Sequence, residues 1–453
     1  MSDEFAAVVG RVRERVTPDA TERERLRAVA DALRERARDA VADLPIDGDR
    51  VSIVQAGSTA RGTWLAGDRD VDLFVCFPPD LDREELETYG LAVGHAVLPD
   101  GHEEYAEHPY VHGEYEGWAV DLVPCYDVAD ATDIQSAVDR TPFHTRYLDA
   151  RLTDALAGEV RVAKQFCKGV GVYGSDLRTR GFSGYLLELL VCEYGGFREF
   201  VEAAASWSPP VRVDPEDHAA ATFDDPLVVV DPTDPERNVA AACAAENVAR
   251  LQHYARELLD DPREDLFERG ERDPLDADEV RAAIEERGTT PVALRFDAPA
   301  LVEDQLYPQL DKSETGIADE LDRRGFDVLR TASFADETAA LLVELEVAER
   351  PTVERHEGPP VHVREHATGF YEKYEGADAY GPFVDGNRYV VEREREFETV
   401  ADLLDSDAVF DVALGKDVAA ALQAEYDLLV GEEVAVLAGE FGQELAAYFD
   451  PKP

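Results

Sequence analysis

Lysine is scarce in this chain of 453 residues and occurs only at positions 164, 168, 312, 373, 416 and 452. Lysine and arginine together number 45, against 98 aspartate and glutamate residues, so the formal net charge is −53. The acidic residues are spread along the whole chain, which makes the charge a property of the surface. Such a surface is tolerated in molar salt, where the Debye length falls to about 3 Å. We therefore predict a halophilic protein, in which acidity argues little against nucleic-acid partners.

Cysteine and long hydrophobic runs are also lacking. Cys76, Cys125, Cys167, Cys192 and Cys243 lie far apart in apolar segments and form no Cys-x-x-Cys pair. Buried reduced thiols are therefore expected rather than disulfides or a metal site. No run approaches the roughly 18 apolar residues that span a bilayer, and the N-terminus lacks the apolar core of a signal peptide. The sequence predicts a cytoplasmic protein with no membrane partner.

The length allows about three domains, and the residue patterns suggest an α+β multidomain protein. The expected domains are 1–140 (α/β in pattern), 141–265 (mainly helical) and 266–453 (α+β). In the first, apolar residues at helical spacing predict a helix over 21–44, with Thr17 and Pro18 as the capping candidate. Runs rich in β-branched and aromatic residues predict strands at 51–55, 71–77, 108–115 and 118–128, with a helix at 82–98.

The third region alternates strand and helix patterns. Strands are predicted at 290–296, 338–347 and 387–397, and helices at 313–325, 418–431 and 433–449. Within it, segment 351–386 shows no clear period, and we predict an extended appendage or tail at about 345–390.

Three aspartates carry the strongest chemical signal. In the strand Asp-Val-Asp-Leu-Phe, a period of two places Asp70 and Asp72 on one face. Paired carboxylates repel one another, so they are expected on a solvated face or around a cation such as Mg²⁺. Asp121 lies inside the otherwise apolar strand Ala-Val-Asp-Leu-Val, where an ionised side chain requires a partner. The combination favours a cation site.

Gly57 and Ser58 follow the strand at 51–55 and open a short helix. Backbone N–H groups and a hydroxyl at such a turn can face an anion, which suits a triphosphate. Taken alone, the same pattern is a common turn.

These segments carry a family resemblance. The run GSTARGTWLAGDRDVDLFVCF followed by VDLVPCY resembles the DNA polymerase β nucleotidyltransferase superfamily. TWL, TPFH at 141–144, RGFSGYL at 180–186 and DPTDPERNVAAA at 231–242 resemble class I, archaeal-type CCA-adding tRNA nucleotidyltransferases. The resemblance covers about 50–250 and implies a polymerase β-like mixed-sheet palm domain, a central helical domain and a C-terminal α+β domain with a tail.

The resemblance also implies roles for single residues. Asp70, Asp72 and Asp121 would be catalytic and would ligate two Mg²⁺ ions that act at the attacking hydroxyl and the leaving pyrophosphate. Ser58 and Arg61 would bind the triphosphate; a plain surface arginine is the alternative for Arg61. Lys164 and Tyr173 would also contact the triphosphate, with Lys168, one helical turn from Lys164, as the alternative.

The nucleotide pocket would extend beyond the catalytic domain. According to the resemblance His144 reaches the nucleotide across a cleft, although a His after Thr-Pro also suits a cap or packing role. Ser183 is predicted to cap a helix and Tyr185 to stack or pack, in a turn that the family places at the pocket. Arg237 would face the base from the N-terminus of a helix, or serve only in a capping turn.

The implied reaction is the template-independent addition of C, C and A from CTP and ATP to the 3′ end of tRNA. The partner would be the acceptor stem and T arm of tRNA, held through backbone and shape; monomer and homodimer both stay open. A poly(A) polymerase or an oligoadenylate synthetase would share the Gly-Ser turn and the three carboxylates. A non-enzymatic RNA-binding module is disfavoured because all three acids are present.

Overall fold

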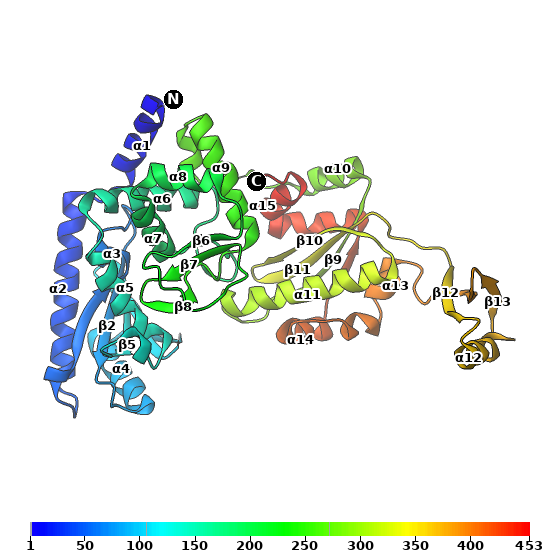
Figure 1. Cartoon of the computed structure of the whole chain (residues 1–453), viewed down its shortest axis with the longest axis horizontal. Coiled ribbons are helices and arrows are strands. Elements are labelled where there is room, and N and C mark those ends of the chain that lie inside the picture. Colours follow the sequence, from blue (N-terminus) through cyan, green and yellow to red (C-terminus); the bar gives the residue numbers. More distant parts are fainter. Residues whose placement is uncertain (1, 106, 271) are drawn as a thin grey trace. The chain divides into compact units, whose positions relative to one another are not determined.

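The computed structural model describes residues 2–105, 107–270 and 272–453. The chain divides into two compact units, one ending at Gly270 and the other spanning Glu271–Lys452. Both units mix helices with sheets, which confirms the predicted α+β class (Figure 1). All residues that the sequence singles out for chemistry lie in the first unit.

A five-stranded mixed sheet forms the first part of this unit. Its strands are β1 (Ser52–Ala56), β2 (Asp70–Phe77), β3 (His102–Tyr105), β4 (Pro109–Tyr115) and β5 (Trp118–Tyr126). Their order is β1-β2-β5-β4-β3, with β2 and β5 parallel and the other neighbours antiparallel. The four predicted strands are therefore confirmed. A fifth, β3, was not predicted, because its sequence HEEY lacks the apolar alternation of a buried strand.

Two helices bury one face of this sheet. They are α2 (Ala20–Ala42), which runs along the sheet in Figure 1, and α4 (Arg83–Val97). Their apolar residues share a core with Val71, Leu73 and Val75 of β2, because a strand turns alternate side chains to the same face. Asp70 and Asp72 therefore belong to the opposite face.

The predicted helix over 21–44 is confirmed, but its cap is different. The N-cap is Asp19, whose carboxylate accepts a hydrogen bond from the backbone N–H of Glu22, and the Glu22 side chain accepts in return from the N–H of Asp19. Thr17 instead donates its hydroxyl hydrogen to the carbonyl of Arg13 in the preceding helix. A complete capping box satisfies two backbone donors, which explains why the helix begins after Asp19.

The second part of the unit is mainly helical. Its helices are α5 (Arg140–Asp149), α6 (Asp154–Gly169), α7 (Gly184–Tyr194), α8 (Phe197–Ser206) and α9 (Ala245–Asp260). They share one core with the N-terminal helix α1 (Ser2–Val16). A short helix, α3 (Gly57–Arg61), connects β1 to the loop before β2.

A small sheet in this region corrects one prediction. The sequence places Arg237 at the N-terminus of a helix or in a capping turn, but Arg237 belongs to strand β8 (Asp234–Asn238), and the next helix begins only at Ala245. The strand β7 (Leu227–Asp231) is buried throughout and needs partners, which β6 (Val211–Val213) and β8 supply. The side chain of Asn238 fixes the hairpin by accepting from the N–H of Val229 and donating to the carbonyl of Leu227. Arg237 therefore lies on a strand.

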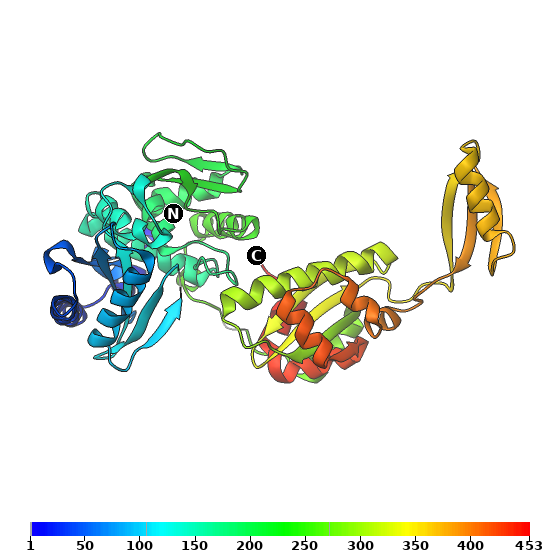
Figure 2. The same ribbon diagram turned by 90° about the horizontal axis from the view of Figure 1, so that it is seen from below.

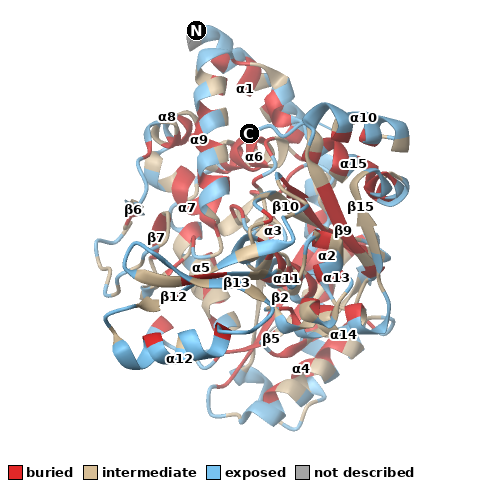
Figure 3. Cartoon of the chain, turned by 90° about the vertical axis from the view of Figure 1, so that its right-hand side faces the viewer, coloured by how far each residue is buried: buried red, intermediate tan, exposed pale blue. Residues whose placement is uncertain are grey.

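The second unit is built on a four-stranded sheet, in the order β10-β11-β9-β15. The strands are β9 (Thr290–Asp297), β10 (Val328–Ala335), β11 (Thr338–Leu345) and β15 (Asp427–Val430). One face packs against α11 (Glu303–Arg324), α13 (Val400–Leu404) and α14 (Lys416–Ala424), and the other against α10 (Ala277–Arg287) and α15 (Ala438–Phe449). Figure 2 shows α11 along the sheet, and Figure 3 shows the buried residues, in red, between these layers.

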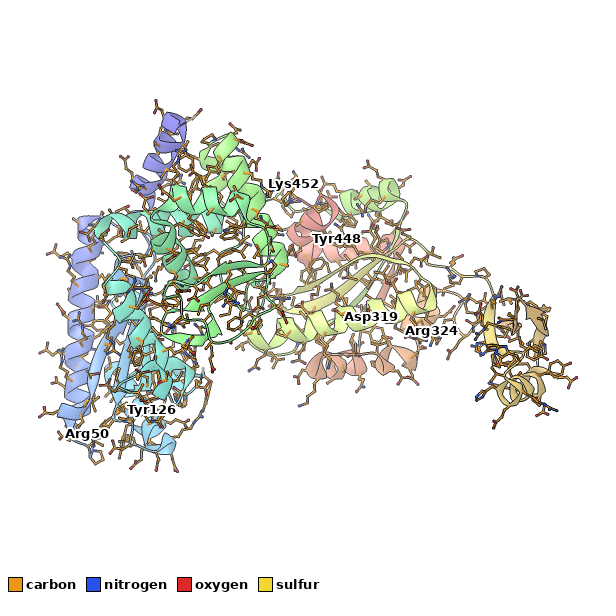
Figure 4. All side chains as sticks on the ribbon, in the orientation of Figure 1. Arg50, Tyr126, Asp319, Arg324, Tyr448 and Lys452 are labelled. Carbon is orange, nitrogen blue, oxygen red and sulfur yellow. The ribbon has the colours of Figure 1, made fainter. Side chains whose placement is uncertain are left out.

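Two details of this unit follow from its packing. The predicted helix over 418–431 ends at Ala424, because residues 427–430 pair with β9 and form the edge strand β15 of the sheet. Glu344 is buried within the sheet and accepts hydrogen bonds from Arg287, Thr289 and Tyr448, the last of which is labelled in Figure 4. A buried carboxylate requires such donors.

The segment without a clear period has its own small fold. It contains β12 (Val353–Pro360), α12 (Arg364–Tyr374) and β13 (Ala379–Asp385), and it pairs with β14 (Arg388–Glu394) in the order β12-β14-β13. The β12 pattern was obscured by polar residues on both faces, which are permitted in a strand with little burial.

Candidate active site

The three predicted aspartates lie on neighbouring strands. Asp70 and Asp72 begin β2, and Asp121 of β5 stands directly opposite Asp72 in the parallel register. Because paired residues in register share a face, the three side chains project from the same side of the sheet. The structure therefore brings together the residues that the sequence could place only on separate strands.

The pKa values of these carboxylates show that their charges are crowded. Burial raises the pKa of Asp72 to about 6, and the neighbouring charges of Asp121 and Asp70 add to this effect. Desolvation, followed by Asp68 and Asp121, also raises the pKa of Asp70. A carboxylate whose ionisation is opposed in this way is stabilised by a cation. Oxygen donors at a strand start therefore fit a hard divalent metal ion.

His112 is a neighbour of this site that the sequence analysis missed. It lies on β4 opposite Asp121, and its Nδ1 is 2.7 Å from Asp121 Oδ1. The hydrogen bond to Asp121 raises the pKa of His112. Within the described residues no group of three His, Cys, Asp or Glu side chains is already arranged to hold a metal. Asp121 is engaged with His112 in this arrangement.

Gly57 brings the backbone of α3 directly against Asp72. Its φ is +71°, and a Cβ at this position would lie 1.7 Å from Asp72 Oδ2. Both the left-handed backbone and the close approach require glycine. Ser58, Thr59 and Arg61 follow on the same short helix.

Arg61 and Lys164 meet at one buried carboxylate, Glu188 of α7. Arg61 Nε lies 2.8 Å from Glu188 Oε2, and Lys164 Nζ lies 3.1 Å from Glu188 Oε1. Thr63 donates its hydroxyl hydrogen to the same carboxylate. Burial alone would raise the pKa of Glu188, but Lys164 and Arg61 hold it below its usual value, while burial lowers the pKa of Lys164. The surface-residue alternative for Arg61 is thus wrong, because its side chain is only 7% exposed.

Lys168 and Tyr173 are also neighbours. Lys168 Nζ lies 3.5 Å from Asp68 Oδ1 and 5.3 Å from the centre of the Tyr173 ring. Unlike Lys164, Lys168 is substantially exposed. The Tyr173 ring is largely buried, and this burial raises the pKa of its hydroxyl.

A pocket of about 840 Å³ contains the other predicted residues, His144, Ser183, Tyr185 and Arg237. Ser183 is the N-cap of α7 and accepts from the N–H of Leu186, as predicted. The rings of His144 and Tyr185 are stacked, with centroids 4.1 Å apart and planes at 18°. Arg140 and Asp234, which form an ion pair, also line the pocket.

Comparison with known proteins agrees with this architecture. Three family models match in order: a nucleotidyltransferase domain over 34–144, the second domain of tRNA nucleotidyltransferase over 158–268, and the C-terminal domain of CCA-adding enzymes over 287–431. A CCA-adding enzyme of Haloarcula marismortui is 63% identical, with 100% of both chains covered. The chain belongs to the family of archaeal CCA-adding enzymes. The CCA-adding enzyme of Methanoregula boonei is 44% identical, with coverage of 95% of this chain and 93% of its own.

Membership makes this CCA-adding enzyme a nucleotidyltransferase, and such enzymes generally depend on divalent metals. Among solved structures, the Cid1 poly(U) polymerase with Mg and 3′-dATP covers 60% of this chain and 100% of its own, at 15% identity and a TM-score of 0.46. No helix in the described part of the chain has the length and apolar composition needed to cross a bilayer.

Three residues at the site were not predicted: His112, Glu188 and Asp231, a buried aspartate beside His144 and Arg237. Glu188 had a usable signal, since a glutamate within the apolar run LLELLV must be paired when it is buried. His112 had no local signal, because only the order of the sheet places it beside Asp121.

Replacing Gly57 with Ala should lower the rate of nucleotide addition by on the order of 10²-fold, because the new methyl group displaces Asp72. The measurement is single-turnover addition to tRNA. Gly62→Ala is the matched control: Gly62 ends the same helix with φ +68°, but has no atom within 4 Å of its Cβ position. That variant should lose about 1–2 kcal/mol of stability and keep its activity. Equal activity losses in both variants would contradict the prediction.

Proposed function

We propose that this CCA-adding enzyme transfers C, C and A from CTP and ATP to the 3′ end of tRNA without a nucleic-acid template, releasing pyrophosphate. The observation that carries the proposal is the set of three carboxylates on β2 and β5, held against the Gly57 turn. Such a set suits transfer of a nucleotide to a hydroxyl by in-line displacement, with no covalent enzyme intermediate.

Asp70, Asp72 and Asp121 would hold the metal, which we propose to be Mg²⁺. Their oxygen donors fit a hard cation, and a cation would relieve the repulsion that raises the pKa of Asp72. When bound, Mg²⁺ supplies positive charge that favours ionisation of the RNA 3′-hydroxyl and stabilises the leaving pyrophosphate. Of the three, Asp121 would also have its orientation fixed by His112.

The nucleotide would be bound by two groups of residues. Gly57, Ser58, Arg61, Lys164 and Tyr173 would face the triphosphate. His144, Ser183, Tyr185 and Arg237 would line the base pocket, which is supported by their presence around one cavity. Glu188 holds Arg61 and Lys164 in place, so the positive charge at the triphosphate would be pre-positioned.

The proposed domain division keeps a catalytic domain at 1–140, a nucleotide- and tRNA-binding domain at 141–265 and a tRNA-binding domain with its tail at 266–453. The order of the three matched family models supports it. The acceptor stem and T arm of tRNA would be recognised through backbone and shape. Sedimentation with and without tRNA distinguishes a monomer from a homodimer.

The test of function uses a tRNA that lacks its 3′ CCA end, both nucleotides and a high-salt buffer. Sequencing of the product 3′ ends should show C, C and A, followed by a stop. Addition of A without limit would contradict the proposal and favour a poly(A) polymerase. A 2′–5′ linkage would favour an oligoadenylate synthetase.

Metal affinity should increase with pH. The pKa of Asp72 is raised to about 6 in the folded, metal-free protein. The folded protein is therefore more stable when Asp72 is protonated, and this stability is lost as pH rises through about 6. A metal binds the ionised form, and Mg²⁺ should therefore raise Tm more at about pH 7 than at about pH 5. Thermal unfolding at constant ionic strength measures this. In Asp72→Asn the difference should shrink; an equal Mg²⁺ effect at both pH values in the parent would count against the metal assignment.

A further inference from the structure

Asp231, at the end of β7, lies beneath the pocket and is fully buried. Its Oδ2 is 2.8 Å from His144 Nε2 and 2.7 Å from Arg237 Nη1. Its Oδ1 accepts from the backbone N–H of Thr233 at 2.9 Å and from the Thr233 hydroxyl at 2.8 Å. Both oxygens are thus occupied within the protein, and Asp231 itself does not line the pocket.

This arrangement keeps the carboxylate ionised although it is buried. Burial alone would raise the pKa of Asp231, but its bonds to His144 and Thr233 hold the pKa far below the usual value. A buried carboxylate accepts hydrogen bonds only, so His144 must carry a hydrogen on Nε2. Asp231 therefore fixes the ring nitrogen of His144 that carries a hydrogen, and it fixes the direction in which Arg237 points.

Among the residues that the structure describes, Arg237 is held through one nitrogen. Nη1 donates to Asp231, while the Arg237 side chain keeps 36% of its surface exposed and lines the pocket. When one nitrogen of a guanidinium is fixed, its remaining N–H groups point in one direction. They can then donate to the acceptor atoms of a base in a single arrangement. A free guanidinium could donate to the acceptors of cytosine and adenine in several orientations, which would weaken discrimination between them.

We infer that Asp231 is a positioning residue that fixes Arg237 and His144 in the base pocket and thereby sets the choice between CTP and ATP at each addition. The inference rests on the proposed function, because it requires that this pocket bind the base. Asp231 would act through its two neighbours and touch no substrate.

The test is a double-mutant cycle of Asp231→Asn and Arg237→Ala in the full-length enzyme. For CTP and ATP separately, kcat and KM are measured on tRNAs ending before the first C, before the second C and before A, and wrong additions are counted by sequencing. Asp231→Asn should raise the KM for the correct nucleotide about tenfold, the loss expected for a charge-assisted hydrogen bond, and raise wrong additions. Its kcat should change less. The double variant should lose less than the sum of the two single losses, because Arg237→Ala already removes the part of the Asp231→Asn effect that acts through Arg237.

Two further variants keep the test decisive if Asp231→Asn folds poorly. Thr233→Val removes one hydrogen bond to Asp231 and should give a smaller loss of the same kind. Asp214→Asn is the control: Asp214 precedes the same small sheet's hairpin and accepts from the backbone N–H groups of His218 and Ala219. It should lose stability without a change in KM or in wrong additions.

The outcomes separate this inference from the pocket assignment. If Arg237→Ala leaves KM and discrimination unchanged, both the pocket assignment and the inference are overturned. Two outcomes would overturn the inference alone and make Asp231 a structural residue. In the first, Arg237→Ala changes KM and discrimination, but Asp231→Asn and Thr233→Val only lower Tm. In the second, the loss of the double variant equals the full sum of the two single losses.

Discussion

Asp72→Asn should reduce nucleotide addition by on the order of 10³-fold or more, since it removes a carboxylate ligand from the proposed metal site. The same change should stabilise the metal-free protein. Burial and the neighbouring carboxylates raise the pKa of Asp72 to about 6, so the ionised side chain at neutral pH destabilises the folded protein by roughly 2–3 kcal/mol. A neutral amide at this position does not carry that cost. An increase in Tm together with a loss of activity separates a functional residue from a structural one.

Single-turnover assays and thermal unfolding of the metal-free protein measure the two effects. Asp80→Asn is the matched control, because Asp80 lies just beyond the other end of β2 and forms an exposed ion pair with Arg50, labelled in Figure 4. Exposed pairs contribute little, so this variant should keep both activity and Tm. Activity of Asp72→Asn within tenfold of the parent would exclude Asp72 as a metal ligand.

Glu188→Gln should cost about 3–5 kcal/mol of stability, because it leaves Arg61 and Lys164 as buried positive charges without a counter-charge. The KM for CTP should also increase, because neither cation is then held toward the proposed triphosphate site. Chemical denaturation at fixed salt measures the first effect and steady-state kinetics the second.

Two controls belong with this prediction. Glu193→Gln changes an exposed glutamate on the same helix and should have almost no effect. The double change Glu188→Met with Lys164→Met removes one cation together with the anion, and should be less destabilising than Glu188→Met alone. A loss below about 1 kcal/mol for Glu188→Gln would show that solvent reaches the cluster and that the pair is not a buried one.

Local patterns predicted much of the fold and the centre of the site. Strand β2 was predictable because alternating side chains separate its aspartates from its valines. Strand β8 was not: its sequence, DPERN, resembles a turn before a helix, and it becomes a strand only because β7 requires a partner. The helix expected over 418–431 ends early for the same reason, since β9 recruits residues 427–430 as β15.

The sequence alone determined that Asp70 and Asp72 share a face. It also predicted that a buried Asp121 requires a partner and that Gly57 forms a turn suited to an anion. Each of these inferences depends on residues close together in the chain. Only the tertiary structure decided which residues support them. Register places Asp121 opposite Asp72 and beside His112, and helix packing brings Glu188 to Arg61. Hydrogen bonds and ion pairs act over a few ångströms, and only the fold brings distant residues of the chain within that range.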